Sequence, residues 1–170
     1  MRGKKGELHP DPDDPPRCRA NKQRGHGTYD NDRPPIVGTV SRESGQVRLR
    51  VAHHTDRETL EQHVHQFTLV GTMCNTDEWR AYHHIIRPHA TVCHAQNEWA
   101  RDDDGDGIRE VHVNTVEGMW TDVRIFLRPF KGVHKRWLSG YVAMTEFRRN
   151  CKRISPNLIH ALVTLHTFDR

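Results

Sequence analysis

The hydrophobic period of the chain changes along its length from two residues to about four, and this change constrains the fold most. Residues 36–40 (IVGTV) and 46–52 (QVRLRVA) are rich in β-branched side chains, and Val47, Leu49 and Val51 alternate with arginines. This alternation predicts two strands with one buried face, joined by a turn in SRESG. Because helical patterns follow the hairpin, the chain is neither all-α nor all-β.

Helical and strand patterns alternate after the hairpin. We predict a helix over 55–67, which Thr55 begins with Glu58 three residues later in a capping pattern. Short apolar runs predict strands over 71–75 and 90–94. Three further helices are predicted from capping signals, apolar stripes and proline stops: Thr76 or Asp77 to Pro88 (Trp79, Tyr82, Ile86), Asn114 to Pro129 (Val116, Met119, Trp120, Val123, Leu127) and Lys135 to Asn150 (Trp137, Leu138, Tyr141, Met144, Phe147). This element order predicts an α/β fold with a mixed sheet flanked by helices.

The chain of 170 residues is long enough for one domain. Its hydrophobic content is 34%, so the core is expected to be thin. Residues 1–33 are polar and contain Pro10, Pro12, Pro15 and Pro16, which predicts an irregular arm. We therefore divide the chain into the arm 1–33, a domain over 34–153 and a C-terminal tail over 154–170.

Basic residues concentrate in the segment 117–153, which has nine Lys and Arg against three acids. A local basic surface of this kind indicates a polyanion partner such as DNA, although a solvated helical face gives the same pattern. No apolar run is long enough for a membrane span, the N-terminus does not resemble a secretion signal, and the four cysteines form no CxxC pair. We therefore expect a cytoplasmic, nucleoid-associated protein. The candidate DNA contacts are Arg124, Arg128, Lys131, Lys135 and Arg136.

Two acids stand where a metal ligand is expected. Asp77 follows a short apolar strand, and functional groups gather at the carboxyl ends of strands in α/β sheets. Glu117 falls in the first turn of a predicted helix, and Arg124 lies seven residues later on the same face. Each has a simpler interpretation, because Asp77 is a preferred helix N-cap and Asn114 with Glu117 forms a capping pattern.

Taken together, TDEWRAY (76–82), HVNTVEGMW (112–120) and the cation seven residues past the Glu resemble the DDE transposases of bacterial insertion sequences, in the subgroup related to Merlin elements. PPIVGTVSRESGQVRLRV (34–51) resembles the second and third strands of that domain, and 55–60 resembles the start of its next helix. The resemblance covers about residues 25–152 and ends in a helix of RRNC type.

This resemblance implies a ribonuclease H-like fold and metal-dependent DNA strand cleavage and joining with Mg²⁺ or Mn²⁺. It assigns Asp77 as the second catalytic, metal-binding acid and Glu117 as the third, with Asn114 as an alternative third ligand. Arg124 matches a DNA-binding cation of the family. The implied partners are the DNA ends of the element and the target DNA, and assembly into a homo-oligomer is left open.

The chain departs from the family pattern at its first acid. The family places an Asp on the first strand, in a segment resembling D-E-x-Y-x-G-x-K, and no strand with a central Asp precedes Pro35. Asp30 and Asp32 lie in a turn-like YDNDRPP segment instead. We therefore expect an incomplete ribonuclease H-like fold without its first strand, in a transposase fragment that is inactive alone. The alternatives are a catalytically dead DNA-binding remnant and a zinc-containing interaction protein.

Three further patterns have weaker functional interpretations. DDDGDG (102–107) resembles the start of a calcium loop, but the twelfth position is Val113 instead of Glu. The 14 histidines raise the question of zinc, yet no HExxH or CxxC spacing is present. Cys93 and His94 are adjacent in a predicted strand, so their side chains should point to opposite faces, which disfavours a nucleophile pair.

Overall fold

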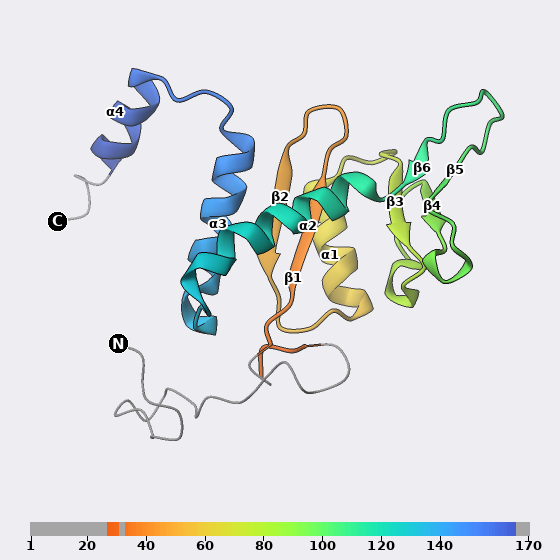
Figure 1. Cartoon of the computed structure of the whole chain (residues 1–170), viewed down its shortest axis with the longest axis horizontal. Helices are drawn as coiled ribbons and strands as arrows, with labels where there is room; N and C mark the ends of the chain where they lie inside the picture. The colour runs from red at the N-terminus through yellow and green to blue at the C-terminus, as the bar shows by residue number, and fades with distance from the viewer. Residues whose placement is uncertain (1–26, 31–32, 166–170) are drawn as a thin grey trace.

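The computed structural model describes residues 27–30 and 33–165, and it is a mixed α/β protein (Figure 1). Its helices and strands, in chain order, are β1 (Ile36–Val40), β2 (Val47–Val51), α1 (Arg57–Phe67), β3 (Cys74–Asp77), β4 (His89–Val92), β5 (Ala100–Arg101), β6 (Val111–His112), α2 (Asn114–Leu127), α3 (Lys135–Asn150) and α4 (Pro156–Leu165). Most of the predicted arm 1–33, including Asp32, lies outside the described residues.

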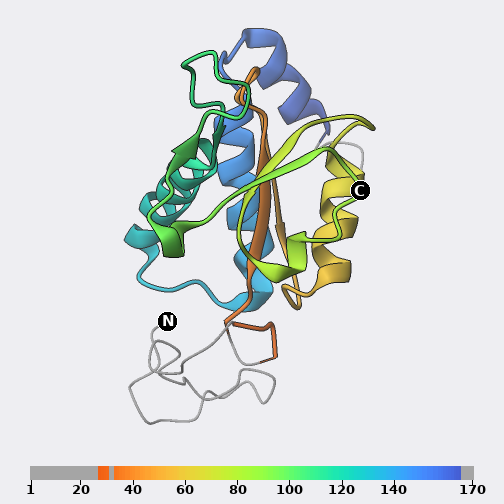
Figure 2. The ribbon, with the colours of Figure 1, turned by 90° about the vertical axis from the view of Figure 1, so that its right-hand side faces the viewer.

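The predicted hairpin is confirmed, and it lies between the helices α1 and α2. β1 and β2 pair antiparallel, and helices pack on both of their faces, α1 on one and α2 on the other (Figure 2). Val37 packs in a cluster with Ala52 and Leu60 of α1. Gly38 lies against α2, where an added Cβ would be 2.9 Å from Cε of the fully buried Met119. A side chain at position 38 would therefore displace the ends of the Leu49 and Met119 side chains.

Helix α3 closes the outer edge of β2 with two side chains. The Leu49 N–H donates to Glu146 Oε2 at 2.6 Å, and the Val47 N–H donates to Asn150 Oδ1 at 2.8 Å. The Asn150 amide nitrogen returns a hydrogen bond to the Val47 carbonyl at 2.9 Å. These contacts satisfy backbone groups that an edge strand otherwise exposes to pairing with another chain.

The strands form three separate two-stranded sheets instead of the single mixed sheet predicted. β3 and β4 pair in parallel, and β5 and β6 form a second hairpin between the predicted strand over 90–94 and the predicted helix from Asn114, where no strand was predicted. The part of the protein that contains β4 and β6 has a core of its own, which consists of Val92, Val111 and Val113. Sequence patterning identified most of the strands, but which strands pair depends on long-range contacts that patterning does not contain.

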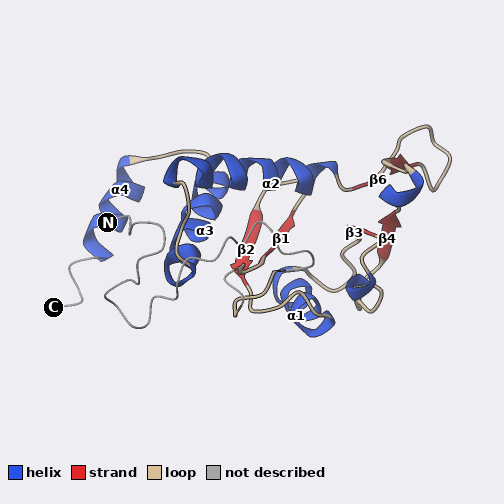
Figure 3. Ribbon diagram, turned by 60° about the horizontal axis from the view of Figure 1, so that its bottom comes forward, coloured by secondary structure: helices blue, strands red, loops and turns tan. Residues whose placement is uncertain are grey.

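Among the described residues, no strand pairs with the inner edge of β1 or with that of β3. Along the molecule the strands follow the order β2, β1, β3, β4 (Figure 3). The β1 ladder uses its odd-numbered residues, because Ser41 continues it with an N–H bond to the Gln46 carbonyl. The Cys74 N–H donates to Pro88, so Asn75 directs its backbone groups away from β4. No hydrogen bond is found in the described part of the chain for the backbone groups that β1 directs away from β2, those of Ile36, Gly38 and Val40.

Three helices form where the sequence predicts them, but their caps differ. α1, α2 and α3 cover the predicted segments. The N-cap of α1 is Asp56, which accepts the Thr59 N–H, so the predicted capping role of Thr55 is wrong. The predicted helix after Asp77 is also wrong, because only a 3₁₀ turn over Arg80–Tyr82 forms there. β3 continues through Asp77, and the Glu78 carboxylate is bonded to the His94 and Ala95 N–H groups, so the first residues of the predicted helix are held in another arrangement.

Two features of the C-terminal half were not predicted. α3 buries Leu138, Val142 and Thr145, while the predicted face residues Trp137, Met144 and Phe147 are exposed. The predicted tail contains the apolar helix α4.

Burial of His63 on α1 gives a testable dependence of stability on pH. The side chain is 2% exposed, and neither ring nitrogen has a hydrogen-bond partner. Burial, with the nearby positive charge of Arg50, lowers the pKa of His63 to about 4. The unfolded chain therefore binds more protons than the folded one between about pH 6.5 and 4, and stability falls as pH drops through this window.

We expect the free energy of unfolding to fall by up to about 3 kcal/mol between pH 6.5 and pH 4 because His63 must become charged on unfolding. His63→Leu should flatten this dependence, as measured by urea denaturation at several pH values. His65→Leu is the matched control, because His65 is exposed on the same helix. An unchanged pH profile in His63→Leu would contradict the assignment.

Candidate functional site

Asp77 ends β3 at the carboxyl end of the parallel strand pair. It lies opposite Val92 of β4, and its side chain is exposed. The carboxylate Oδ1 accepts the Trp79 N–H at 3.2 Å, which fixes a tight turn after the strand. The N-cap interpretation therefore does not hold, because no α-helix follows.

Glu78 joins the ends of β3 and β4. Its two carboxylate oxygens accept the backbone N–H groups of His94 at 3.0 Å and Ala95 at 3.3 Å. Hydrogen bonds from its own backbone N–H and from these two groups lower the pKa of the Glu78 carboxyl. The sequence placed Glu78 beside Asp77 but gave no sign of this contact, because its partners are 16 and 17 residues away.

His94 links the strand ends to helix α2. Its Nε2 lies 3.7 Å from Glu117 Oε1, and its Nδ1 is buried without a hydrogen-bond partner. Glu117 lies in the first turn of α2, where the helix dipole favours a carboxylate, and its side chain is 54% exposed. His94 thus connects the segment that carries Asp77 to Glu117, although no hydrogen bond or ion pair joins these two acids directly among the described residues.

The predicted capping role of Asn114 is wrong. The N-cap of α2 is Val113, which makes no side-chain cap bond, and Asn114 is the first residue of the helix. The Asn114 side chain is exposed and has no hydrogen-bond partner among the described residues. Its amide oxygen is therefore available in the same helical turn as Glu117.

Arg42 fixes the strand that leads into α2, and sequence reasoning missed it. From the turn between β1 and β2, its guanidinium donates to the carbonyl oxygens of Glu110 and His112. Burial lowers the pKa of Arg42, and the opposing charge of Glu110 partly offsets the effect. These partners are 68 and 70 residues away, so no local pattern indicates the contact.

Most of the candidate DNA contacts are exposed. Lys135 differs, because its Nζ donates to the Tyr29 carbonyl at 3.0 Å and lies 4.9 Å from the Tyr29 ring centroid. Lys135 therefore holds the segment before β1 against the start of α3. The four exposed cations are Arg124 on α2, Arg128 and Lys131 in the connection, and Arg136 on α3.

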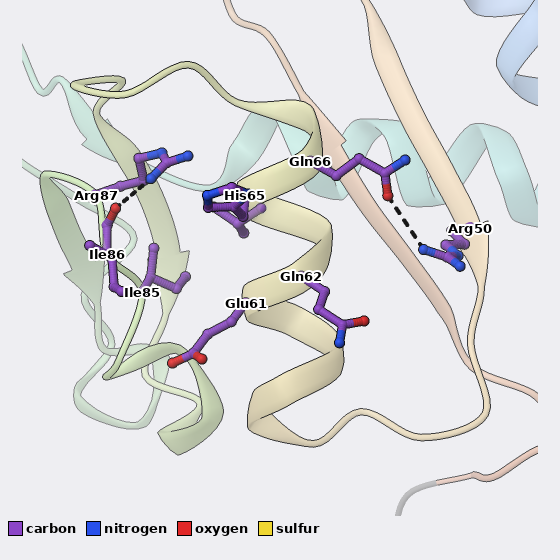
Figure 4. A pocket seen from close by; sticks show the side chains of 9 residues that line it. Arg50, Glu61, Gln62, His65, Gln66, Ile85, Ile86 and Arg87 are labelled. Atoms are coloured by element: carbon purple, nitrogen blue, oxygen red, sulfur yellow. Dashed lines mark hydrogen bonds between the residues drawn. The ribbon is translucent and has the colours of Figure 1, made fainter.

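Two other features of the structure do not include Asp77 or Glu117, and the first is a pocket. A pocket of about 430 Å³ lies between α1 and the segment before β4, lined by side chains that include Arg50, Glu61 and Arg87 (Figure 4). The Arg87 guanidinium is already bonded to Thr68 and the Ile86 carbonyl, and no candidate site residue lines the pocket.

The acidic loop between β5 and β6 brings three carboxylates within 4.8 Å of one another, the one such group of three metal-binding side chains in the described residues. The carboxylates accept backbone N–H groups of their own loop. The loop therefore has a structural account without an ion, and the three residues are Asp102, Asp104 and Asp106.

Acidic groups at the ends of a parallel strand pair, with a polar helix start beside them, define an α/β protein with a polar site at the strand ends. None of the helices in the described ranges is long and apolar enough to cross a membrane. The family model of the ISXO2-like transposase domain matches residues 11–150, and the chain belongs to this family.

A curated relative supports the same family. The chain is 28% identical over 142 residues to a protein of Halobacterium salinarum named "Uncharacterized protein in transposable element ISH50". The match covers 83% of this chain and 47% of the relative, so the chain spans about half the length of the curated relative it matches. The family match confirms the resemblance to insertion-sequence transposases and supports a transposase-related function.

Proposed function

We propose that this chain is the catalytic-domain part of an insertion-sequence transposase, whose complete form cleaves and joins DNA strands with a divalent metal. The observation that carries the proposal is the contact chain from the end of β3 through His94 to Glu117. It brings an acid-bearing strand end and an acid-bearing helix start into one region of a domain that belongs to a transposase family.

The unpaired edges support an incomplete ribonuclease H-like fold. In the described part of the chain, β1 and β3 each have a partner strand on one side only, and the two open sides lie between them in the strand order (Figure 3). One additional strand between them would produce a continuous five-stranded mixed sheet. In the resemblance, the missing first strand carries the first catalytic Asp.

The donor set fits a hard divalent cation. Asp77, Glu117 and Asn114 offer carboxylate and amide oxygens, which are the ligands that Mg²⁺ and Mn²⁺ prefer. A bound ion would supply charge neutralisation on the phosphate. Two residues of the chain would position the ligands of this ion. Glu78 would hold the backbone at His94, and His94 would position Glu117 through the contact between them.

A catalytically dead DNA-binding remnant is the second candidate, and the exposed cations favour it. A zinc-containing interaction protein has less support, because the described residues bring no three Cys or His side chains within ligand distance. DNA binding itself is common to the first two candidates, so it is the first property to test.

We expect the chain to bind duplex DNA of unrelated sequence, with log K falling linearly with log salt at about −0.9 per phosphate neutralised. Arg124→Ala together with Arg128→Ala should reduce the slope by about two units, because each exposed cation contributes one phosphate contact. Fluorescence anisotropy at several salt concentrations measures both quantities.

The matched control is Arg57→Ala, because Arg57 is a cation that already pairs with Glu61 on α1. We expect it to leave the slope unchanged. Absence of binding at low salt, or binding that does not depend on salt, would contradict the proposed DNA partner.

A further inference from the structure

The turn between β4 and β5 holds an exposed tryptophan on a fixed backbone. The Glu98 N–H donates to the Cys93 carbonyl at 3.1 Å, and the Glu98 carboxylate accepts the Cys93 N–H at 2.9 Å. Arg101 adds a hydrogen bond to the same carboxylate at 2.8 Å. Asn97 closes the turn in the left-handed region at φ 59°. Trp99 follows Glu98 and lies two residues before Arg101, so hydrogen bonds hold the chain on both sides of it.

The Trp99 ring is exposed beside the candidate site. Its side chain is 59% exposed, and its ring centroid lies 5.0 Å from that of His94. His94 in turn lies 3.7 Å from the Glu117 carboxylate. An exposed indole therefore lies two contacts away from a candidate metal ligand.

We propose that Trp99 is a stacking platform for an unpaired nucleobase of the DNA substrate. This inference rests on the proposed function. A tryptophan offers a large flat face at a low cost in conformational entropy, and nucleobases stack on such faces with little dependence on sequence. Because bases inside a duplex are already stacked on each other, the occupant is a base at a nick, a flap or a strand end.

The charges around Trp99 favour a base over a phosphate. The acidic loop with Asp102, Asp104 and Asp106 follows within a few residues, and it would repel a phosphate at this position. A nucleobase is uncharged, so it tolerates these neighbours. The phosphates of the same strand are then expected on the side of α2, where Arg124 is exposed.

The test compares two DNA molecules of equal charge. One is a fully paired duplex, and the other has the same number of nucleotides and phosphates but three unpaired nucleotides next to a nick; both are measured at the same salt concentration. We expect Trp99→Ala to weaken binding to the second by about 5- to 150-fold and to change binding to the first by less than about twofold. Trp99→Phe should retain most of the preference, because phenylalanine keeps an aromatic face.

Trp137→Ala is the matched control, because Trp137 is 65% exposed on α3, away from His94. It should leave the ratio of the two affinities unchanged. Thermal unfolding of each variant verifies that the fold is intact, and 2-aminopurine at the unpaired position gives a second readout, since stacking on Trp99 quenches its emission.

Three outcomes would overturn the inference. If wild type binds both DNA molecules equally, or Trp99→Ala weakens both equally, DNA binding stands but the stacking role fails. If wild type binds neither DNA, the proposed function fails as well. If Trp99→Ala instead converts a dimer to a monomer in sedimentation experiments and leaves the DNA ratio unchanged, the surface binds a second copy of the chain.

Discussion

The 170-residue chain is expected to produce no strand cleavage and no strand joining on DNA that carries the ends of its parent element, with Mg²⁺ or with Mn²⁺. Two-metal phosphoryl transfer needs two cations about 3.5–4 Å apart, which requires ligands that bridge both. Asp77 and Glu117 are separate acids that His94 connects, and the neighbouring Glu78 carboxylate is bonded to backbone N–H groups. The described residues bring no group of three metal-binding side chains together at this place.

The size of the expected loss follows from how phosphoryl transfer is accelerated. Charge develops on both the attacking and the leaving oxygen, and preorganised cations stabilise it. Two ligands hold at most one ion weakly, so we expect the acceleration that a complete site supplies, on the order of 10⁶-fold or more, to be lost. The acidic loop does not replace the missing ligand, because its carboxylates are bonded to its own backbone.

Nicking and strand-transfer assays measure this prediction directly. Activity that disappears in both Asp77→Ala and Glu117→Ala would contradict it and would mean that a first ligand exists elsewhere in the chain. Asp30→Ala and Asp32→Ala then identify whether the turn before β1 supplies it. Asp122→Ala is a control for acid removal in general, because Asp122 already pairs with Arg149.

Met119→Ala is expected to destabilise the fold by about 2–5 kcal/mol, the largest stability effect that we predict for a single side chain. Met119 is fully buried where α2 crosses the β1–β2 hairpin, and its Cε fills the space that Gly38 leaves. Its removal therefore costs transfer free energy and leaves a cavity. Because a domain is typically stable by only about 5–15 kcal/mol, such a loss is large.

Met144→Ala is the matched control, since Met144 is a methionine that is 57% exposed on α3. We expect it to change the free energy of unfolding by no more than about 0.5 kcal/mol. Urea denaturation followed by circular dichroism measures both variants. A loss below about 1 kcal/mol for Met119→Ala would contradict the packing of α2 against the hairpin.

Local sequence signals predicted the elements whose physics is local. The alternation of Val47, Leu49 and Val51 defined a strand with one buried face, and the hairpin formed with β1 over the predicted residues. The apolar stripes of α1, α2 and α3 predicted their extents, because helix periodicity and turn chemistry act within a few residues. The helix predicted after Asp77 is wrong, because β3 extends through Asp77 and Glu78 is bonded to His94, a long-range contact that local sequence does not indicate.

The candidate site was likewise predicted only in part from the sequence. The sequence placed Asp77 at a strand end and Glu117 in a first helical turn, and both positions are confirmed. Their functions as metal ligands stay predictions. Asn114 was interpreted as half of a capping pair, but α2 begins at Asn114 itself, and the Asn114 side chain is exposed.

By itself, the sequence determined the hairpin, the extents of three helices, the transposase family, and the positions of Asp77 at a strand end and Glu117 in a first helical turn. Only the tertiary structure decided which strands pair in the described part of the chain, that Glu78 and His94 connect the strand ends to α2, and that Arg42 holds β6. The reason is physical. Hydrophobic periodicity and capping act over a few residues, whereas these contacts join side chains to partners 16 to 70 residues away, and their formation depends on how the layers pack.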